Sequence, residues 1–333
     1  MELLEMLKIL CAAPSPSGDE GGALAAVNAC AADAGLTFER DTLGNYVSVG
    51  GSEVAVLAHI DKIGFMVTGI DEATGFLRIV KAGGTDARTA PAQRVKVYGK
   101  RTLPGVIVST PPHLLPKDGD NKVLPIDKLT VDCGLKYDEI KELVRPGDRI
   151  LTDSPLLPLA GTRVSAPYLD NCAGVAAALK AAEIIKAAGG RMPRVVLTVM
   201  EETGGSGAMT AAFPEDVKTV IATDVTFAVQ PGTSEEEAAP MGSGARIAFA
   251  PVLSKALSQK LVSLAGENGI PYTVEVMGRY TGTDADDAAV AGTGRVTGLV
   301  SIPIRYMHTP AETADLTDIE AAAKLIAAAA VVS

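Results

Sequence analysis

The sequence is poor in several features that mark common protein classes. It contains no tryptophan and only 4% aromatic residues, so it offers few of the flat side chains on which sugar rings usually stack. Its four cysteines are widely spaced and form no C-x-x-C pair, which argues against a structural zinc site or a disulfide framework. No apolar run approaches membrane-spanning length, and the N-terminal stretch 1–10 is too short and too acidic for a signal peptide. We therefore expect a cytoplasmic protein.

Positive charge is also in deficit. Lys and Arg number 30 against 40 Asp and Glu, which leaves a net charge of -10. Such a charge balance repels nucleic-acid phosphates and anionic membranes, so neither is an expected partner. Apolar residues make up 47% of the 333 positions, which is enough for a large hydrophobic core and for two domains of ordinary size.

The hydrophobic pattern divides the chain into two kinds of region. In 1–63 and 158–333, apolar runs of strand length alternate with helical patterns, as in the predicted strand Ser52–His59 and the predicted helix Ala173–Ala188. In 64–157, short strands are separated by glycine and proline turns. The sequence therefore predicts an α/β domain with a mixed sheet, made of 1–63 and 158–333, into which a small β-rich domain of residues 64–157 is inserted.

One buried strand is predicted to end in two adjacent carboxylates. Val195–Met200 is apolar apart from Thr198 and rich in β-branched residues, which is typical of a strand covered on both faces. Glu201 and Glu202 follow it, and a glycine-rich run then ends the strand, at the edge where open α/β sheets gather ligand sites. Neighbouring side chains on an extended backbone point to opposite sides, so we expect these two carboxylates to have different roles.

Side chains of metal-ligand type follow other predicted strands as well. His59 and Asp61 lie two positions apart and therefore on one face, and Asp170, Asp224 and His308 also follow apolar segments. Imidazole with carboxylate is a ligand mix that zinc, cobalt or manganese accept, and a cluster without thiolates favours a catalytic site. A carboxylate shared by two such ligand pairs could hold two cations roughly 3.5–4 Å apart, with a hydroxide between them that attacks a carbonyl.

Local motifs also predict helix starts and a turn. Ser17 with Glu20 would form a capping box and open a helix that runs to Gly35, and Thr317 with Glu320 would do the same for the C-terminal helix. The turn signal Leu43-Gly44-Asn45 would join two short strands.

Six segments occur in the order of the motifs of one enzyme family. They are AHIDKIGFMV, LDNCAG, MEETGGSGA, TDVT, TGTDA and IPIRYMHTPAE. Together they resemble metallopeptidase family forty-two, the co-catalytic aminopeptidases that include glutamyl and deblocking aminopeptidases and the tetrahedral peptidases. The resemblance covers essentially the whole chain. It implies a mixed-sheet, phosphorylase/hydrolase-like catalytic domain with an inserted PDZ-like or barrel-like dimerisation domain, and dimers that assemble to a dodecamer.

The same resemblance implies two divalent metal ions per subunit, zinc or cobalt, with manganese as a further candidate. His59 and Asp224 would bind one ion, Glu202 and His308 would bind the other, and Asp170 would bridge them.

The remaining site residues would act on the substrate and on the ligands. Glu201 would be the general base that deprotonates the bridging water and passes the proton to the leaving amine. Asp61 would orient the imidazole of His59. Thr283 and Asp284, in the TGTDA segment, would contact the peptide.

These inferences favour a dinuclear aminopeptidase that removes N-terminal residues from peptides. Two alternatives stay open. A glycoside hydrolase, in line with the endoglucanase label carried by some similar proteins, needs only paired carboxylates but leaves His59, His308 and Asp224 unexplained. A related metal-dependent carboxypeptidase or N-deacylase would use similar ligands.

The N-terminal residue that the enzyme prefers depends on side chains in the loops 230–246 and 278–286. The motifs do not identify this preference.

Overall fold

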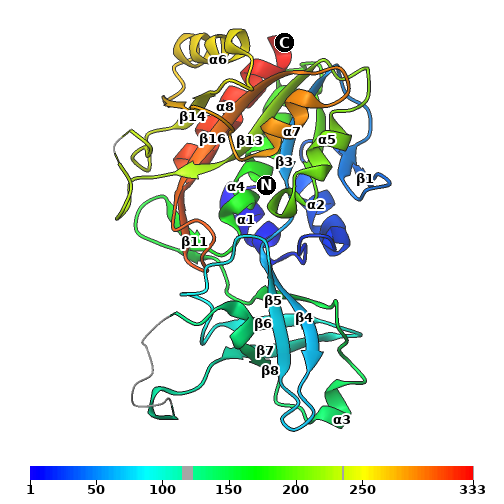
Figure 1. Cartoon of the computed structure of the whole chain (residues 1–333). Helices are drawn as coiled ribbons and strands as arrows, with labels where there is room; N and C mark the ends of the chain where they lie inside the picture. The colour runs from blue at the N-terminus through cyan, green and yellow to red at the C-terminus, as the bar shows by residue number, and fades with distance from the viewer. Residues whose placement is uncertain (115–122, 235, 333) are drawn as a thin grey trace. The chain divides into compact units, whose positions relative to one another are not determined.

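The structure is a computed structural model that describes residues 1–114, 123–234 and 236–332, and its chain is traced by colour in Figure 1. Over this part of the chain, no helix is both long and apolar enough to span a membrane.

The chain folds as two units that each have a sheet and a buried core of their own. The first unit contains Met1–Asp61, Pro155–Met307 and the chain from Ala311 onward. The second contains Lys62–Ser154 and His308–Pro310.

The sheet of the first unit has a parallel centre. Within the described residues, eleven strands form this mixed sheet. In its centre β3 (Val54–His59) pairs in parallel with β12 (Arg194–Thr198) and β13 (Thr219–Phe227), and β13 pairs in parallel with β16 (Val296–Arg305). All six residues of β3 are buried, because helices cover both of its faces. The carboxyl ends of these four strands therefore point toward the same edge, which confirms the predicted α/β fold class.

Antiparallel strands extend the sheet from this centre. β2 pairs with β12, and β17 and β14 each pair with β16, all in antiparallel orientation. β15 then pairs with β14 in parallel. The bounds of these outer strands are β1 Phe38–Arg40, β2 Tyr46–Ser48, β10 Leu157–Pro158, β11 Arg163–Ala166, β14 Ala245–Phe249, β15 Tyr272–Val276 and β17 Glu312–Asp315.

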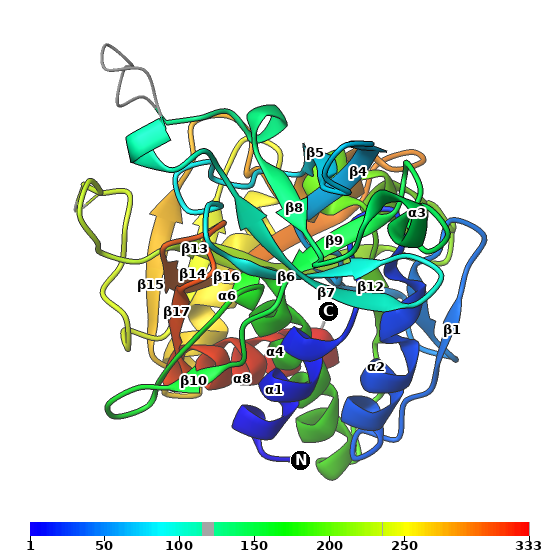
Figure 2. The same ribbon diagram turned by 90° about the horizontal axis from the view of Figure 1, so that it is seen from below.

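Helices lie on both faces of this sheet. Figure 2 shows α1, α2, α4 and α8 together on one face. On the other face, Ala208 of α5 and Ala288 of α7 share a core cluster with Ala55 and Leu57 of β3, whose side chains point to the same side of the strand. The helix bounds are α1 Leu3–Ala12, α2 Leu24–Ala31, α4 Leu169–Ala187, α5 Ser206–Ala211, α6 Lys255–Glu267, α7 Asp284–Val290 and α8 Leu316–Val332.

The second unit is a closed barrel of antiparallel strands in the order β4-β5-β8-β7-β6-β9. Leu77, Val97, Ile107, Val131 and Ile150 are buried in its interior. The strand bounds are β4 Gly64–Ile70, β5 Leu77–Ala82, β6 Arg94–Tyr98, β7 Thr102–Val108, β8 Thr130–Asp132 and β9 Arg149–Thr152, and the short helix α3 is Tyr137–Ile140. The barrel confirms the β-rich fold predicted for the inserted segment.

The two predicted capping boxes are wrong. The first helical turn after Ser17 is the 3-10 helix Glu20–Ala23, which precedes α2, and Ser17 Oγ lies 2.8 Å from Thr203 Oγ1. At the C-terminal helix, the amide of Thr317 donates to the Asp315 carboxylate at 3.1 Å, so Asp315 takes the capping role. Small polar side chains bond whichever partner the fold brings near, and the local motif alone does not decide it.

Loss of one interior side chain should destabilise the barrel. Ile150 in β9 is fully buried, so Ile150→Ala should lower the free energy of unfolding by about 3 kcal/mol, through lost burial and the cavity left behind. Val106 in β7 is 39% exposed, so the control Val106→Ala should cost less than about 1 kcal/mol. Urea unfolding followed by far-ultraviolet circular dichroism measures both, and equal losses would contradict the buried position of Ile150.

Candidate metal and catalytic site

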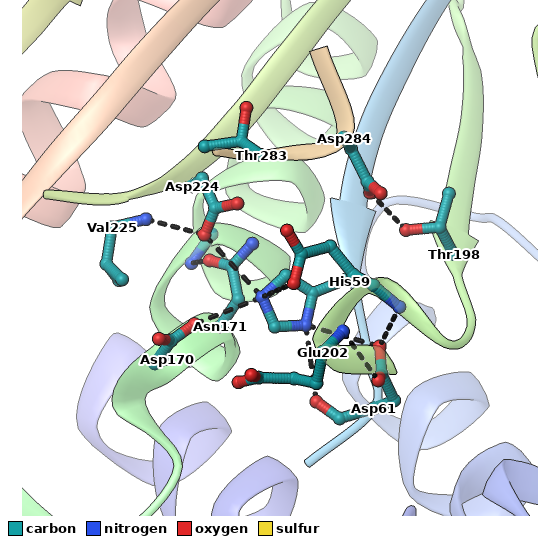
Figure 3. A network of polar contacts seen from close by, with 12 residues as sticks. His59, Asp61, Asp170, Asn171, Thr198, Glu202, Asp224, Val225, Thr283 and Asp284 are labelled. Atoms are coloured by element: carbon teal, nitrogen blue, oxygen red, sulfur yellow. Dashed lines mark hydrogen bonds and ion pairs between the residues drawn. The ribbon is translucent and has the colours of Figure 1, made fainter. Parts of the chain in front are cut away.

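His59 ends the central strand β3 and has only 1% of its surface exposed. Its Nε2 atom lies 3.0 Å from Asp170 Oδ1, 3.6 Å from Asp224 Oδ1 and 3.9 Å from Glu201 Oε2. Its Nδ1 atom lies 3.2 Å from the carbonyl oxygen of Asp61 and 3.4 Å from the carboxylate of the same residue. Figure 3 shows the imidazole between Asp61, Asp170 and Asp224. One ring nitrogen therefore faces the backbone and carboxylate oxygens of Asp61, and the other faces acids from other elements.

Asp170 and Asp224 approach His59 from two different elements. Asp224 lies in β13, the parallel neighbour of β3, and its Oδ1 atom accepts a hydrogen bond from the amide of Val225 at 2.8 Å. Asp170 lies at the start of α4, where its backbone angles are not helical. One ligand atom from each of His59, Asp170 and Asp224 lies within 4.8 Å of the other two, and all three residues are buried.

Two buried polar residues hold the start of α4 in place. The Asp170 amide donates to Glu312 Oε2 at 3.0 Å. The neighbouring Asn171 donates from Nδ2 to the carbonyl oxygen of Thr223 at 2.9 Å, which ties α4 to β13 beside Asp224. The geometry of the cluster therefore depends on contacts between the helix, the strand and the segment that opens β17.

Glu201 and Glu202 lie on a tight turn. β12 ends at Thr198, and Glu201–Thr203 form a 3-10 helix after Met200, whose left-handed backbone has a φ of +58°. The Asp61 carboxylate accepts hydrogen bonds from the amides of Glu201 at 3.0 Å and Glu202 at 3.2 Å. The expected extended backbone, with the two carboxylates on opposite sides, is therefore wrong. One ligand atom of each lies within 4.8 Å of the other and of the His59 ring.

Burial is the largest single influence on the pKa of each of these groups. It raises the pKa of Glu201 to about 9, because His59 opposes the shift only in part and carboxylates such as Asp224 and Asp284 add to it. It also raises the pKa of Asp224. For His59, burial lowers the pKa, but Asp224, Glu201 and Asp170 outweigh it and hold the pKa well above its usual value. The site thus gathers acids where water screens their repulsion poorly.

The donor set fits a divalent cation. Imidazole nitrogen and carboxylate oxygen are the ligands that zinc, cobalt and manganese accept. His59, Asp170 and Asp224 offer one such set, and His59 with Glu201 and Glu202 offers a second. A bound cation would offset the mutual repulsion of these buried carboxylates, which otherwise costs free energy.

The structure also describes the three remaining residues predicted for the site. His308 follows β16, has a φ of +61° and belongs by its contacts to the second unit, so its role as a ligand stays a prediction. Thr283 caps α7 by accepting a hydrogen bond from the amide of Ala285 at 3.2 Å. Asp284 is 3% exposed and accepts a hydrogen bond from Thr198, and burial raises its pKa to about 7. Substrate contact by Thr283 or Asp284 also stays a prediction.

The sequence analysis did not predict a role for Glu312 or Asn171, the two residues that hold the start of α4. Glu312 and Asn171 are each 1% exposed. Glu312 lies 142 positions from the amide that it accepts, and Asn171 lies 52 positions from the carbonyl that it binds. Their one signal is a position inside the segments IPIRYMHTPAE and LDNCAG, because burial and distant partners leave no local pattern.

Comparisons with known proteins agree on one family. The family model described as M42 glutamyl aminopeptidase matches residues 44–325. The lysyl aminopeptidase of Pyrococcus furiosus is 35% identical over 96% of this chain and 94% of its own length. Two similar solved structures were found. An aminopeptidase from the archaeon Desulfurococcus kamchatkensis has a TM-score of 0.89 and 31% identity, with 99% of this chain and 95% of that one covered. The TET1 peptidase of Pyrococcus horikoshii has a TM-score of 0.85 and 31% identity, with 98% of both chains covered.

Asp61→Asn should weaken metal binding. The change replaces one acceptor oxygen with an amino group that faces the amides of Glu201 and Glu202, so one of these hydrogen bonds is lost. We expect zinc affinity to fall by about 10–100-fold, as measured by titration of the metal-free protein against a chelating dye. The control is Asp216→Asn, which removes an exposed partner of Arg194 and should leave affinity unchanged. Wild-type affinity in Asp61→Asn would contradict the role given to this carboxylate.

Proposed function

Because the chain belongs to the M42 glutamyl aminopeptidase family, we propose that it is a dinuclear metal-dependent aminopeptidase that hydrolyses N-terminal residues from peptides. The observation that carries this proposal is the buried cluster of His59, Asp170 and Asp224, with Glu201 and Glu202 beside the same imidazole. Such a set combines groups of metal-ligand type with a further carboxylate, Glu201, that could act as a base.

Five side chains would hold the two ions. His59 and Asp224 would hold the first ion, Glu202 and His308 would hold the second, and Asp170 would contribute to both. Zinc or cobalt are the proposed metals, with manganese as a third choice. When bound, such ions polarise the carbonyl of the scissile bond and lower the pKa of a water.

Glu201 is the proposed general base. Its Oε2 atom lies 3.9 Å from His59 Nε2, and its side chain keeps 15% exposure, so it borders the cluster and can still reach a substrate. Burial makes this carboxylate a stronger proton acceptor than a solvated glutamate, and neighbouring cations would bring its pKa back toward neutrality, where a base is most effective. Glu201 takes the proton of the attacking water and delivers it to the nitrogen of the leaving amine as the C–N bond breaks.

Asp61 would hold the His59 ring and the backbone of Glu201 and Glu202 in a fixed relative position. It contacts the His59 ring and accepts the amide hydrogens of Glu201 and Glu202, so one carboxylate fixes a ligand and the base together. Residues of this kind hold ligands and bases in the geometry that catalysis needs.

The substrate is proposed to be a peptide whose free α-amine is held by carboxylates beside the ions, with Thr283 and Asp284 as further contacts. Thr283 is the more exposed of these two residues. The TET1 peptidase, according to its description, assembles into a tetrahedron or an octahedral shell, and we propose that this chain also self-associates, as dimers that build a dodecamer. The cytoplasm is its proposed compartment, on the basis of the cysteine spacing.

Glu201→Gln should separate catalysis from metal binding. The amide cannot accept a proton, so kcat should fall by about 100–10,000-fold while metal content stays unchanged. Initial rates on an aminoacyl p-nitroanilide and elemental analysis measure the two quantities. The matched variant His308→Ala should lose one of the two ions instead. Near wild-type turnover in Glu201→Gln would rule out the general base.

Activity should require both a metal and a free N-terminus. EDTA should abolish hydrolysis of a free tripeptide, and zinc or cobalt should restore it. The N-acetylated tripeptide should not be cleaved, because it lacks the ammonium group that the carboxylates bind. Equal cleavage of both peptides would favour an N-deacylase or a carboxypeptidase. Hydrolysis of a β-glucan that survives EDTA would favour a glycoside hydrolase.

A further inference from the structure

The segment Val199–Gly207, here called the carboxylate turn, begins and ends on the same side chain. Asn45 Oδ1 accepts a hydrogen bond from the Val199 amide at 3.0 Å, and Asn45 Nδ2 donates to the Gly207 carbonyl oxygen at 3.2 Å. A Cβ atom at Gly207 would lie 2.2 Å from the Val199 carbonyl oxygen and 2.7 Å from Asn45 Oδ1. Only glycine therefore allows the two ends to close on Asn45.

Asn45 is itself held in one orientation. It is fully buried, and its Nδ2 atom also lies 2.8 Å from Asp41 Oδ2 and 3.1 Å from Thr210 Oγ1, so its two hydrogens are shared among three acceptors. The other oxygen of Asp41 accepts from the amides of Gly44 and Asn45, so the carboxylate is fixed by its own loop. The acceptor at Asp41 determines which end of the Asn45 amide carries the hydrogens, and this leaves Oδ1 to face Val199.

The middle of the carboxylate turn is held from other segments. Asp61 accepts the amides of Glu201 and Glu202, and Ser17 Oγ lies 2.8 Å from Thr203 Oγ1. Asn45 differs from these two because it binds both ends of the turn. Removing it would free the turn at the two points where its path is set.

We infer that Asn45 is a positioning residue for peptide hydrolysis, because it closes the carboxylate turn so that Glu201 and Glu202 face His59. The inference rests on the proposed function, since it concerns the base and a ligand named there. Asn45 binds backbone and side-chain groups at the ends of the turn and acts on the reaction only through it. Its loss should therefore change the chemical step more than substrate binding.

The test compares Asn45→Ala with Asn28→Ala in the full-length, metal-loaded protein. Asn28 is a matched control, because it is a partly buried asparagine whose Oδ1 accepts one backbone hydrogen bond, from Phe38 at 2.8 Å. For Asn45→Ala we expect kcat to fall about tenfold or more, with KM within about twofold of wild type. Asn28→Ala should keep both constants. If Asn45→Ala does not fold, Asn45→Ser replaces it, since its short hydroxyl group adds no charge beside Asp41 and cannot bind both Val199 and Gly207.

Hydrogen exchange read by mass spectrometry supplies a measurement that needs no activity. Exchange over 199–207 should speed up at least about tenfold in the Asn45 variant and stay unchanged in Asn28→Ala. Unchanged exchange would overturn the inference, and so would faster exchange with wild-type kcat. If the unaltered protein cleaved no peptide, the proposed function would fail and the positioning role with it, while exchange would still decide whether Asn45 holds the turn.

Discussion

Crowding of negative charge around one buried imidazole is the constraint on which this structure depends. His59 lies among the carboxylates of Asp170, Asp224 and Glu201, and burial raises the pKa of the acids instead of letting water stabilise their charge. Buried charge is costly unless it is compensated, so this arrangement is suited to binding a divalent cation. The rest of the first unit can be understood as the scaffold that brings these groups together and keeps them from separating.

The parallel centre of the sheet brings the groups together. β3 and β13 are parallel neighbours, so His59 and Asp224 lie beside each other although 165 positions separate them in the chain. Hydrogen bonds from outside the strands then fix the loops. Asp61 accepts hydrogen bonds from the amides of Glu201 and Glu202, and Glu312 accepts one from the amide of Asp170. Asn45 binds both ends of the carboxylate turn.

The family is confirmed by the match of residues 44–325 and by similarity to aminopeptidases over almost the entire chain. This agreement follows from the set of six motifs, because no single carboxylate or histidine identifies a peptidase. The inserted segment forms a closed antiparallel barrel. Closure pairs the backbone N–H and C=O groups that the edge strands of an open sheet would leave exposed.

The sequence by itself determined the fold class, the family and the position of His59 at the end of a strand, because the hydrophobic pattern and the motifs are local properties of the chain. The predicted strand end at Asp224 is wrong, since β13 continues to Phe227. Only the tertiary structure decided the path around Glu201 and Glu202, where the left-handed Met200 replaces an extended backbone. It also decided that Asn45, which the sequence presents only as part of a turn, binds groups more than 150 positions away. Burial and hydrogen-bond partners depend on segments distant in the chain, so neighbouring residues carry no signal for them.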